Sequence, residues 1–410
     1  MRIKRCAVLL LEPSEKVTFA VESLLRGGNG LCHELQWLAL APHLDAPVPV
    51  DGQEREALGL LSANRWTERS SLDCDAAVVD RLISVGLVLD ESQPESSAAL
   101  QDNRLRAAHW HPLAAVLHAF TRWEGVDSVK NSQDSGTETI EQMRRTLGPP
   151  PAEAEERAIA ADQVVTLPTV VYGDFDALLG RRVTCRNFDL DRALPLETLS
   201  HMLQRVFAAK SSIKIGEDLV FLKKSVPSGG GLHPIEAYLL VQNVVGLAAG
   251  VYHYRADTHV LERLPGIDLT RTFVMEAVGQ QHWFADAQVL VALVPRFART
   301  FWKYRQHAKA YRVIAMEAGH LSQTLYLAAT DLGLGAFITG AINEKYLERA
   351  LSLDPITQGV LAVCGFGLRG AHMVTTELDP DGRIWSLPDG DPEQTSAVDI
   401  EGADSGPLRG

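Results

Sequence analysis

The segment RVTCRNF at residues 182–188 places two arginines on either side of a hydroxyl, with one residue between each pair. Alternate side chains of an extended segment point the same way, so Arg182, Thr184 and Arg186 would converge on one anion. Forked guanidinium donors and a hydroxyl donor together suit a phosphate group. Taken alone, the segment is better explained as a solvated basic stretch.

A glycine-rich stretch, PSGGGLHP at residues 227–234, precedes a predicted strand. Ser228, Gly229 and Gly230 lie where the backbone can approach a flat or anionic ligand and offer free N–H groups. The stretch lacks the GK[ST] ending of a Walker A loop. A plain turn is the alternative for this stretch on its own.

Three further motifs follow along the chain. EAGHLSQ at 317–323 lies on a predicted helix that ends in LGLG at 332–335 and leads to Thr339 and Gly340. GFGLR at 365–369 is a glycine turn after a buried strand, and Arg369 would add a further phosphate donor.

The length of 410 residues predicts two or three domains at about 150 residues each. We expect a small α/β module at 1–90, a helical connector and linker at 91–165, a main domain at 166–387 and a disordered tail at 388–410. The first module resembles a winged-helix or peptide-clasp unit, with an ordinary α/β cap as the alternative. GPPP at 148–151 marks the linker.

Apolar periodicity predicts the main elements. Helices are expected at 54–61, 76–85, 109–123, 196–208 and 311–332. Strands are expected at 6–11, 86–89, 236–243, 287–294 and 359–364, and the polar stretch 91–104 is expected to be a loop. This alternation of helices and strands favours an α/β or α+β domain.

In this order, the motifs resemble the flavin-dependent nitroreductase superfamily, and more narrowly its SagB-type azoline dehydrogenase branch, the peptide maturation dehydrogenases. The likeness rests on R-x-[ST]-x-R-x-F at 182–188, PSGGGLHP at 227–234, VYHY at 251–254, EAGH-x-x-Q at 317–323, LGLG at 332–335 and G-x-G at 365–367. It implies an α+β fold with a central mixed or antiparallel sheet flanked by helices, and it makes 166–387 the cofactor domain.

The resemblance also implies an FMN cofactor held at the interface of a homodimer. Arg182, Thr184, Arg186 and Arg369 would hold its phosphate and ribityl oxygens. Ser228, Gly229 and Gly230 would meet the isoalloxazine ring from the other protomer, and Thr339 and Gly340 would lie by the N5 edge. An anionic phosphate and a reduced ring that gains negative charge both need such donors.

The segment FWKYR at 301–305, followed by Tyr311, indicates the reaction. Members of the azoline dehydrogenase branch carry a Lys-Tyr pair that Lys303 and Tyr304 match. A buried lysine near an arginine, or a tyrosine beside a lysine, can take a proton during an oxidation. The interval to Tyr311 is slightly longer than the family's pattern, so the pattern does not decide between the two as the base. Aromatic packing with a surface lysine is the alternative.

The resemblance therefore implies a dehydrogenase that oxidises a peptide thiazoline or oxazoline to the azole, with a precursor peptide as substrate and a cyclase as possible partner. Oxygen would reoxidise the flavin. An NAD(P)H-dependent nitro or quinone reductase, and a desaturase of a peptide residue without a heterocycle, are the alternatives. A non-catalytic scaffold that delivers a peptide to a cyclase is a third.

The composition of the chain excludes some classes of binding partner and indicates a cell compartment. The formal net charge of −13 disfavours a nucleic-acid or basic membrane binder, although residues 181–370 carry 21 basic and 16 acidic side chains. Five scattered cysteines without a CxxC pair disfavour a disulfide framework and a zinc ribbon, so no metal is expected. Without a visible secretory signal, we expect a cytoplasmic protein.

Overall fold

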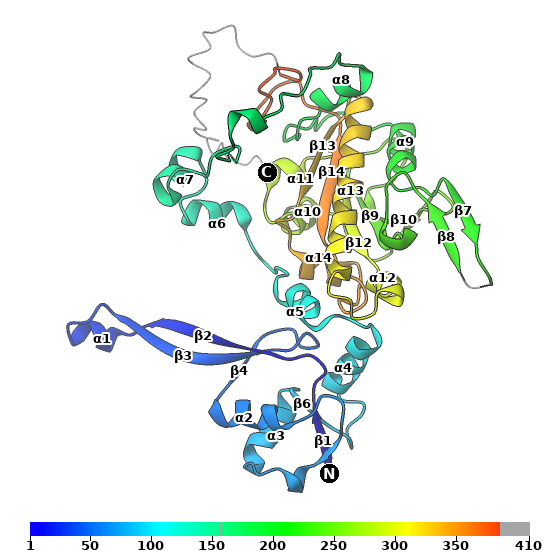
Figure 1. The fold of residues 1–410 in the computed structure, drawn as a ribbon. Coiled ribbons are helices and arrows are strands. Elements are labelled where there is room, and N and C mark those ends of the chain that lie inside the picture. The colour runs from blue at the N-terminus through cyan, green and yellow to red at the C-terminus, as the bar shows by residue number, and fades with distance from the viewer. Residues whose placement is uncertain (156, 218, 386–410) are drawn as a thin grey trace.

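The computed structural model describes residues 1–155, 157–217 and 219–385, so the predicted tail at 388–410 lies outside the described residues. Its strands are β1 (Arg2–Arg5), β2 (Leu10–Phe19), β3 (Leu31–Leu40), β4 (Val48–Val50), β5 (Thr67–Glu68), β6 (Val88–Asp90), β7 (Ser211–Lys214), β8 (Val220–Lys223), β9 (Ile235–Val241), β10 (Gly250–Arg255), β11 (Val260–Arg263), β12 (Val289–Pro295), β13 (Gly335–Thr339) and β14 (Ala362–Gly367). Its α-helices are α1 (Val21–Leu25), α2 (Gly52–Leu60), α3 (Ala76–Ser84), α4 (Ser97–Ala107), α5 (Pro112–Phe120), α6 (Ser128–Asp134), α7 (Ile140–Leu147), α8 (Asp174–Gly180), α9 (Leu196–Val206), α10 (Arg271–Ala277), α11 (His282–Ala285), α12 (Phe297–Lys303), α13 (Ala310–Asp331) and α14 (Glu344–Ala350). Figure 1 shows their arrangement.

The main domain is built on a six-stranded sheet in the order β11-β10-β9-β12-β14-β13. Every neighbouring pair of strands in it runs antiparallel. Thr184 adds a parallel bridge to Ala336 at the β13 edge. The expected α+β class with an antiparallel or mixed central sheet is confirmed.

Helices cover both faces of this sheet, because its central strands are apolar on both sides. On one face Leu239 and Val291 lie in a core cluster with Leu325 of α13, and α9 packs beside that helix. On the other face Leu240 lies in a second cluster with Val274 of α10, together with α11 and α14. The predicted helices at 196–208 and 311–332 and the strands at 236–243 and 287–294 are confirmed.

The long helix α13 spans 22 residues, or about 33 Å. It ends where Gly333 takes a φ of 69°, and the Leu334 N–H then donates to the Ala329 carbonyl at 2.8 Å. A glycine in this left-handed conformation is a common end for a helix. The site described below is arranged along this helix.

The N-terminal 90 residues form two three-stranded antiparallel sheets, β5-β1-β6, against which α2 and α3 pack, and β2-β3-β4. The predicted helices 54–61 and 76–85 are confirmed, and the strand expected at 86–89 lies at Val88–Asp90 after a turn at Gly86. The strand expected at 6–11 is wrong. The chain leaves β1 at Arg5, and a hairpin of two ten-residue strands, β2 and β3, begins at Leu10 and projects from the body (Figure 1).

The connector also differs from expectation. Residues 91–104 are not all loop, because Ser96 caps α4 by accepting the Ala99 N–H at 3.3 Å and Leu105 is buried against the core. The helix expected at 109–123 begins only at Pro112, since His109 takes a φ of 58°.

The strand expected at 359–364 begins at Ala362. The proposed domain boundaries remain predictions.

Candidate active site

The arginine segment alternates as its sequence predicts. Val183 and Cys185 are buried, whereas Arg182, Thr184 and Arg186 are half-buried on the other side. The Cys185 N–H donates to the Ala336 carbonyl at 2.8 Å, which fixes the segment to the end of the sheet. The three polar side chains therefore share one side of an extended segment, as an anion site requires.

Tyr326, which sequence reasoning missed, ties this segment to β13. Its hydroxyl lies 3.1 Å from Thr184 Oγ1 and accepts the Ile338 N–H at 3.2 Å. The Arg182 guanidinium lies 5.4 Å from the centroid of the Tyr326 ring. The only signal in the sequence is a tyrosine on the buried, otherwise mostly aliphatic face of α13.

Thr339 and Gly340 come directly after Ile338, whose N–H donates to Tyr326. Thr339 is buried, and its hydroxyl accepts from the Gln281 amide at 3.1 Å and from the Ala341 N–H at 3.2 Å. Gly340 is exposed, and a Cβ on it would have no heavy atom within 4 Å. The chain thus offers an open backbone position at Gly340, directly after β13.

Arg369 also contacts the arginine segment, but its guanidinium already pairs with a carboxylate. Its Nη1 lies 2.7 Å from Oε2 of Glu377, and its Nη2 donates to the Val183 carbonyl at 3.1 Å. Glu377 Oε1 accepts the Arg186 N–H at 2.6 Å. Burial alone raises the pKa of Glu377, but the N–H donors of Arg186, Trp385 and Asn187 and the charge of Arg369 lower that pKa overall. Sequence reasoning missed Glu377, which stands in a polar stretch without a motif.

The glycine loop lies against the first half of α13. The Gly229 N–H donates to Oε1 of Glu317 at 2.9 Å, and Ser228 Oγ accepts the His233 N–H at 2.8 Å. Burial raises the pKa of Glu317, although the hydrogen bonds from Gly229 and Ser228 oppose that rise. Gly230 has a φ of 69° and is exposed.

Lys303 and Tyr304 converge on this loop. A Cβ built on Gly230 would lie 2.8 Å from Lys303 Nζ and 2.9 Å from Tyr304 Oη. The expectation of a buried lysine is wrong, because Lys303 is the last residue of α12 and its side chain is exposed. Tyr304 is half-buried. Two groups that can accept or donate a proton therefore stand at an exposed backbone position.

The connector holds the turn that carries this pair. The Gln306 N–H donates to the His109 carbonyl at 2.9 Å, and both residues adopt a left-handed φ, of 52° and 58°. Trp110 packs on Phe297 and Phe301 of α12 with ring centroids 4.6 and 4.7 Å apart. Strained backbone of this kind persists only where the surroundings impose it.

The expected site residues thus fall into two clusters along α13. Val313 lies against the glycine loop and Tyr326 against the arginine segment, and the separation of thirteen positions corresponds to about 20 Å of helix. The donors fit an FMN cofactor, since one cluster offers two guanidinium groups and a hydroxyl and the other an open glycine backbone.

Among the described residues, no group of three His, Cys, Asp or Glu could hold a metal ion. None of the helices in that part of the chain has the length and apolarity to cross a membrane.

Residues 179–368 match the Nitroreductase family. A nitroreductase homologue from Methanocaldococcus jannaschii is 30% identical over 189 residues, which are 46% of this chain and 89% of that protein. The trifolitoxin-processing protein TfxB of Rhizobium leguminosarum is 30% identical over 42% of this chain and 47% of its own length. The microcin B17-processing protein McbC of Escherichia coli is 26% identical over 44% of this chain and 65% of its own length. Among solved structures, the E. coli microcin synthetase McbBCD complex with truncated pro-MccB17 bound aligns with 65% of this chain and 97% of the matched chain, at 20% identity and a TM-score of 0.46.

Proposed function

Because this chain belongs to the nitroreductase family, a family of oxidoreductases, we propose that it is an FMN-dependent dehydrogenase that oxidises a peptide thiazoline or oxazoline to the azole. The observation that carries this proposal is the convergence of Lys303 Nζ and Tyr304 Oη on Gly230. Dehydrogenation of an azoline removes a proton as well as a hydride, so it needs a proton-accepting group beside the substrate.

The chain's donors would hold the cofactor from two sides. Arg182, Thr184 and Arg186 bind its phosphate and ribityl oxygens, and Arg369 supports them while paired with Glu377. Ser228, Gly229 and Gly230 would receive the ring of FMN, and Thr339 and Gly340 would lie by its N5 edge. Since about 20 Å of α13 separates the two clusters, we propose that the second cluster comes from the partner protomer of a homodimer.

The oxidation removes one hydride and one proton from the ring of the substrate. FMN, when bound, supplies the acceptor for the hydride. Lys303 Nζ or Tyr304 Oη would take the proton, and the two groups are adjacent, with Lys303 Nζ 5.3 Å from the centroid of the Tyr304 ring. The Glu317 carboxylate orients the loop by accepting the Gly229 N–H.

Two relatives support a peptide substrate. TfxB and McbC are named for the processing of trifolitoxin and microcin B17, and they match 42% and 44% of this chain. We extend peptide processing to this chain, with a precursor peptide as substrate and a cyclase as possible partner. The N-terminal unit at 1–90 would bind or orient that peptide.

The exposure of Lys303 favours one alternative, an NAD(P)H-dependent reductase of nitro or quinone compounds, because such an enzyme needs no buried base. A desaturase of a peptide residue without a heterocycle would use the same groups. A colourless protein would point instead to a peptide-delivery scaffold.

Mass spectrometry of an azoline-containing peptide, incubated with the flavin-loaded protein and oxygen, tests the proposal. We expect a loss of two hydrogens per ring, which Lys303→Ala and Tyr304→Phe abolish or slow while flavin content stays constant. Lys309→Ala is the matched control, because Lys309 is an exposed lysine just before α13. Rapid NAD(P)H oxidation retained by both variants, with no mass change in the peptide, would contradict the proposal.

A further inference from the structure

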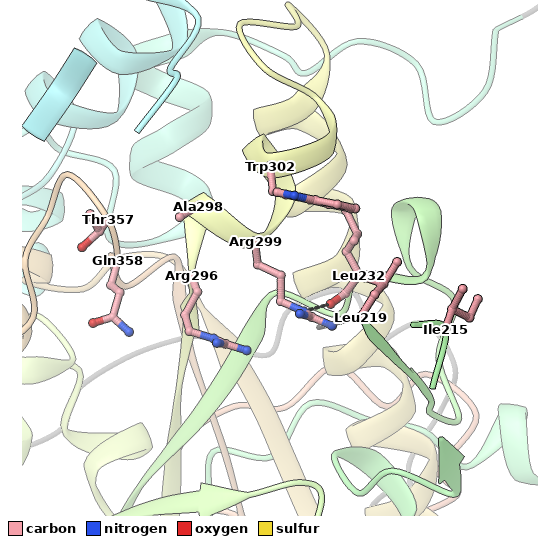
Figure 2. A pocket seen from close by; sticks show the side chains of 9 residues that line it. All are labelled: Ile215, Leu219, Leu232, Arg296, Ala298, Arg299, Trp302, Thr357 and Gln358. Atoms are coloured by element: carbon pink, nitrogen blue, oxygen red, sulfur yellow. Dashed lines mark hydrogen bonds between the residues drawn. The ribbon is translucent and has the colours of Figure 1, made fainter. Parts of the chain in front are cut away.

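A cavity of about 680 Å³ adjoins the candidate site and takes no part in the function proposed above. Its wall includes Arg296, Arg299 and Trp302 around helix α12, Leu232 of the glycine loop and Gln358 (Figure 2). The helix therefore contributes to both places, since its last residue, Lys303, reaches Gly230. A ligand in the cavity would contact Trp302, which directly precedes Lys303 in the chain.

The cavity wall carries more positive than negative charge. Arg296 pairs with Glu236 at 2.7 Å, but the same carboxylate also lies 3.4 Å from His253 Nε2. In the described chain, Arg299 donates only to the backbone carbonyls of Leu232 and Val220, and no carboxylate pairs with it. Burial, followed by the charge of Arg296, lowers the pKa of Arg299.

A third cation lies near these two arginines. Lys224 is only 5% exposed, and no hydrogen bond or ion pair of its ammonium is found among residues 1–385 other than 156 and 218. Burial lowers the pKa of Lys224, and the neighbouring charges of Arg296 and Arg299 lower it further while that of Glu236 opposes them. Because Arg299 pairs with no carboxylate in the described chain and Arg296 shares Glu236 with His253, an anion in this cavity is favourable.

The rest of the wall suits a peptide. Trp302, which is 52% exposed, and Ile215, which is also exposed, give the cavity two large apolar side chains. The Gln358 carboxamide also borders the cavity, where it can bond to a peptide group. Figure 2 shows the side chains of Arg296 and Arg299 extending in the same direction, with Trp302 near Leu232 and Leu219.

We propose that this cavity binds a carboxylate of the peptide substrate through Arg299 and Arg296, with an adjacent large apolar side chain against Trp302. The inference rests on the proposed peptide dehydrogenase function and adds a preference for substrates that carry an acidic group near the ring. The carboxylate would be an Asp or Glu side chain or the C-terminus of the peptide.

Fluorescence anisotropy with short fluorescein-labelled peptides tests this without turnover. One peptide holds a phenylalanine and a glutamate and has an amidated end. A second has glutamine in place of the glutamate, and a third is that glutamine peptide with a free C-terminal carboxylate. We expect the first or the third to bind the flavin-loaded wild type about tenfold more tightly than the second, in a salt-dependent way. Which of the two binds identifies the carboxylate.

The variants separate binding from folding. Arg299→Gln should remove the preference and Arg299→Lys should keep part of it, whereas Arg263→Gln, an exposed arginine of β11, should change nothing. Because Arg299 also bonds to backbone, Trp302→Ala serves as a second variant that leaves those bonds intact and should weaken all three peptides. Melting temperatures check that each variant is folded.

Equal binding of the three peptides to the wild type would overturn the inference even if the enzyme dehydrogenates its substrate. Displacement by adenosine 2′,5′-bisphosphate that depends on Arg299, without any preference among the peptides, would overturn it in favour of a nucleotide phosphate site. A colourless or inactive protein that still prefers a carboxylate peptide would instead contradict the proposed function and leave the cavity's role standing.

Discussion

Lys303 Nζ lies 2.8 Å from the position that a Cβ on Gly230 would occupy. Seventy-three residues separate the two in sequence, and they meet because α12 ends beside the glycine loop. The absence of a side chain at Gly230 is thus what leaves space for the ammonium and for the Tyr304 hydroxyl.

Gly230→Ala should therefore remove activity more than stability. The new methyl group would displace the flexible ends of Lys303 and Tyr304, and a misplacement of about 1 Å in reacting groups costs about 100-fold in rate. A left-handed alanine also destabilises the fold by about 1–2 kcal/mol. Peptide dehydrogenation rates and urea denaturation measure the two effects.

Gly266→Ala is the matched control, since Gly266 has a φ of 75° and open space around its Cβ position. It should show a similar loss of stability with normal turnover. Equal turnover in the two variants would mean that Lys303 and Tyr304 have no role at the loop.

Arg182→Ala should lower FMN affinity by about tenfold or more, because a charge-assisted hydrogen bond contributes about 1.5–3 kcal/mol. Arg181→Ala should leave the affinity unchanged, since the neighbouring Arg181 is exposed and one position out of the alternation. Titration of apoprotein with FMN, followed by flavin fluorescence, gives both dissociation constants. Two equal losses would place the phosphate elsewhere.

Glu377→Ala should destabilise the protein by about 3 kcal/mol, because it leaves Arg369, which is 15% exposed, without its buried partner. Asp381→Ala removes a partner that is 65% exposed, at 4.0 Å from Arg383 in the same segment, and should change stability by less than about 1 kcal/mol. Urea denaturation compares the two variants. A loss for Glu377→Ala no larger than that of the control would show that the C-terminal segment is not held by this carboxylate.

Glu344 should make stability depend on pH. Burial, together with the nearby charge of Glu348, raises the pKa of Glu344 from its usual 4.5 to about 7. The folded state therefore keeps the proton more tightly than the unfolded state, so this group's contribution to stability falls as pH rises from about 4.5 to about 7. Glu344→Gln should remove that fall. The free energies of unfolding of both proteins at pH 5 and pH 8 test this, and parallel changes in the two would refute it.

Local patterns in the sequence predicted local structure well. The period of two in RVTCRNF correctly separated the buried Val183 and Cys185 from the half-buried Arg182 and Thr184, because strand geometry alone decides this. The strongly apolar strands and α13 were predicted because their apolar residues follow the patterns of a buried strand and of a helix.

Contacts between distant segments were not predictable in this way. Glu377 stands in a polar stretch, and only the fold brings it to Arg369. The hairpin β2–β3 is exposed on most positions of β2 and on half of those of β3, so no apolar alternation marks it. Helix α4 has a polar composition and forms because Ser96 caps it and Leu105 is buried.

Anaerobic mixing of the flavin-loaded protein with an azoline-containing peptide tests the central claim most directly. The flavin absorbance should bleach without NAD(P)H in the wild type and in Lys309→Ala, while Lys303→Ala and Tyr304→Phe bleach at least about 100-fold more slowly at equal flavin content. A flavin that the peptide leaves oxidised but that NAD(P)H reduces equally in all four proteins would contradict a peptide dehydrogenase.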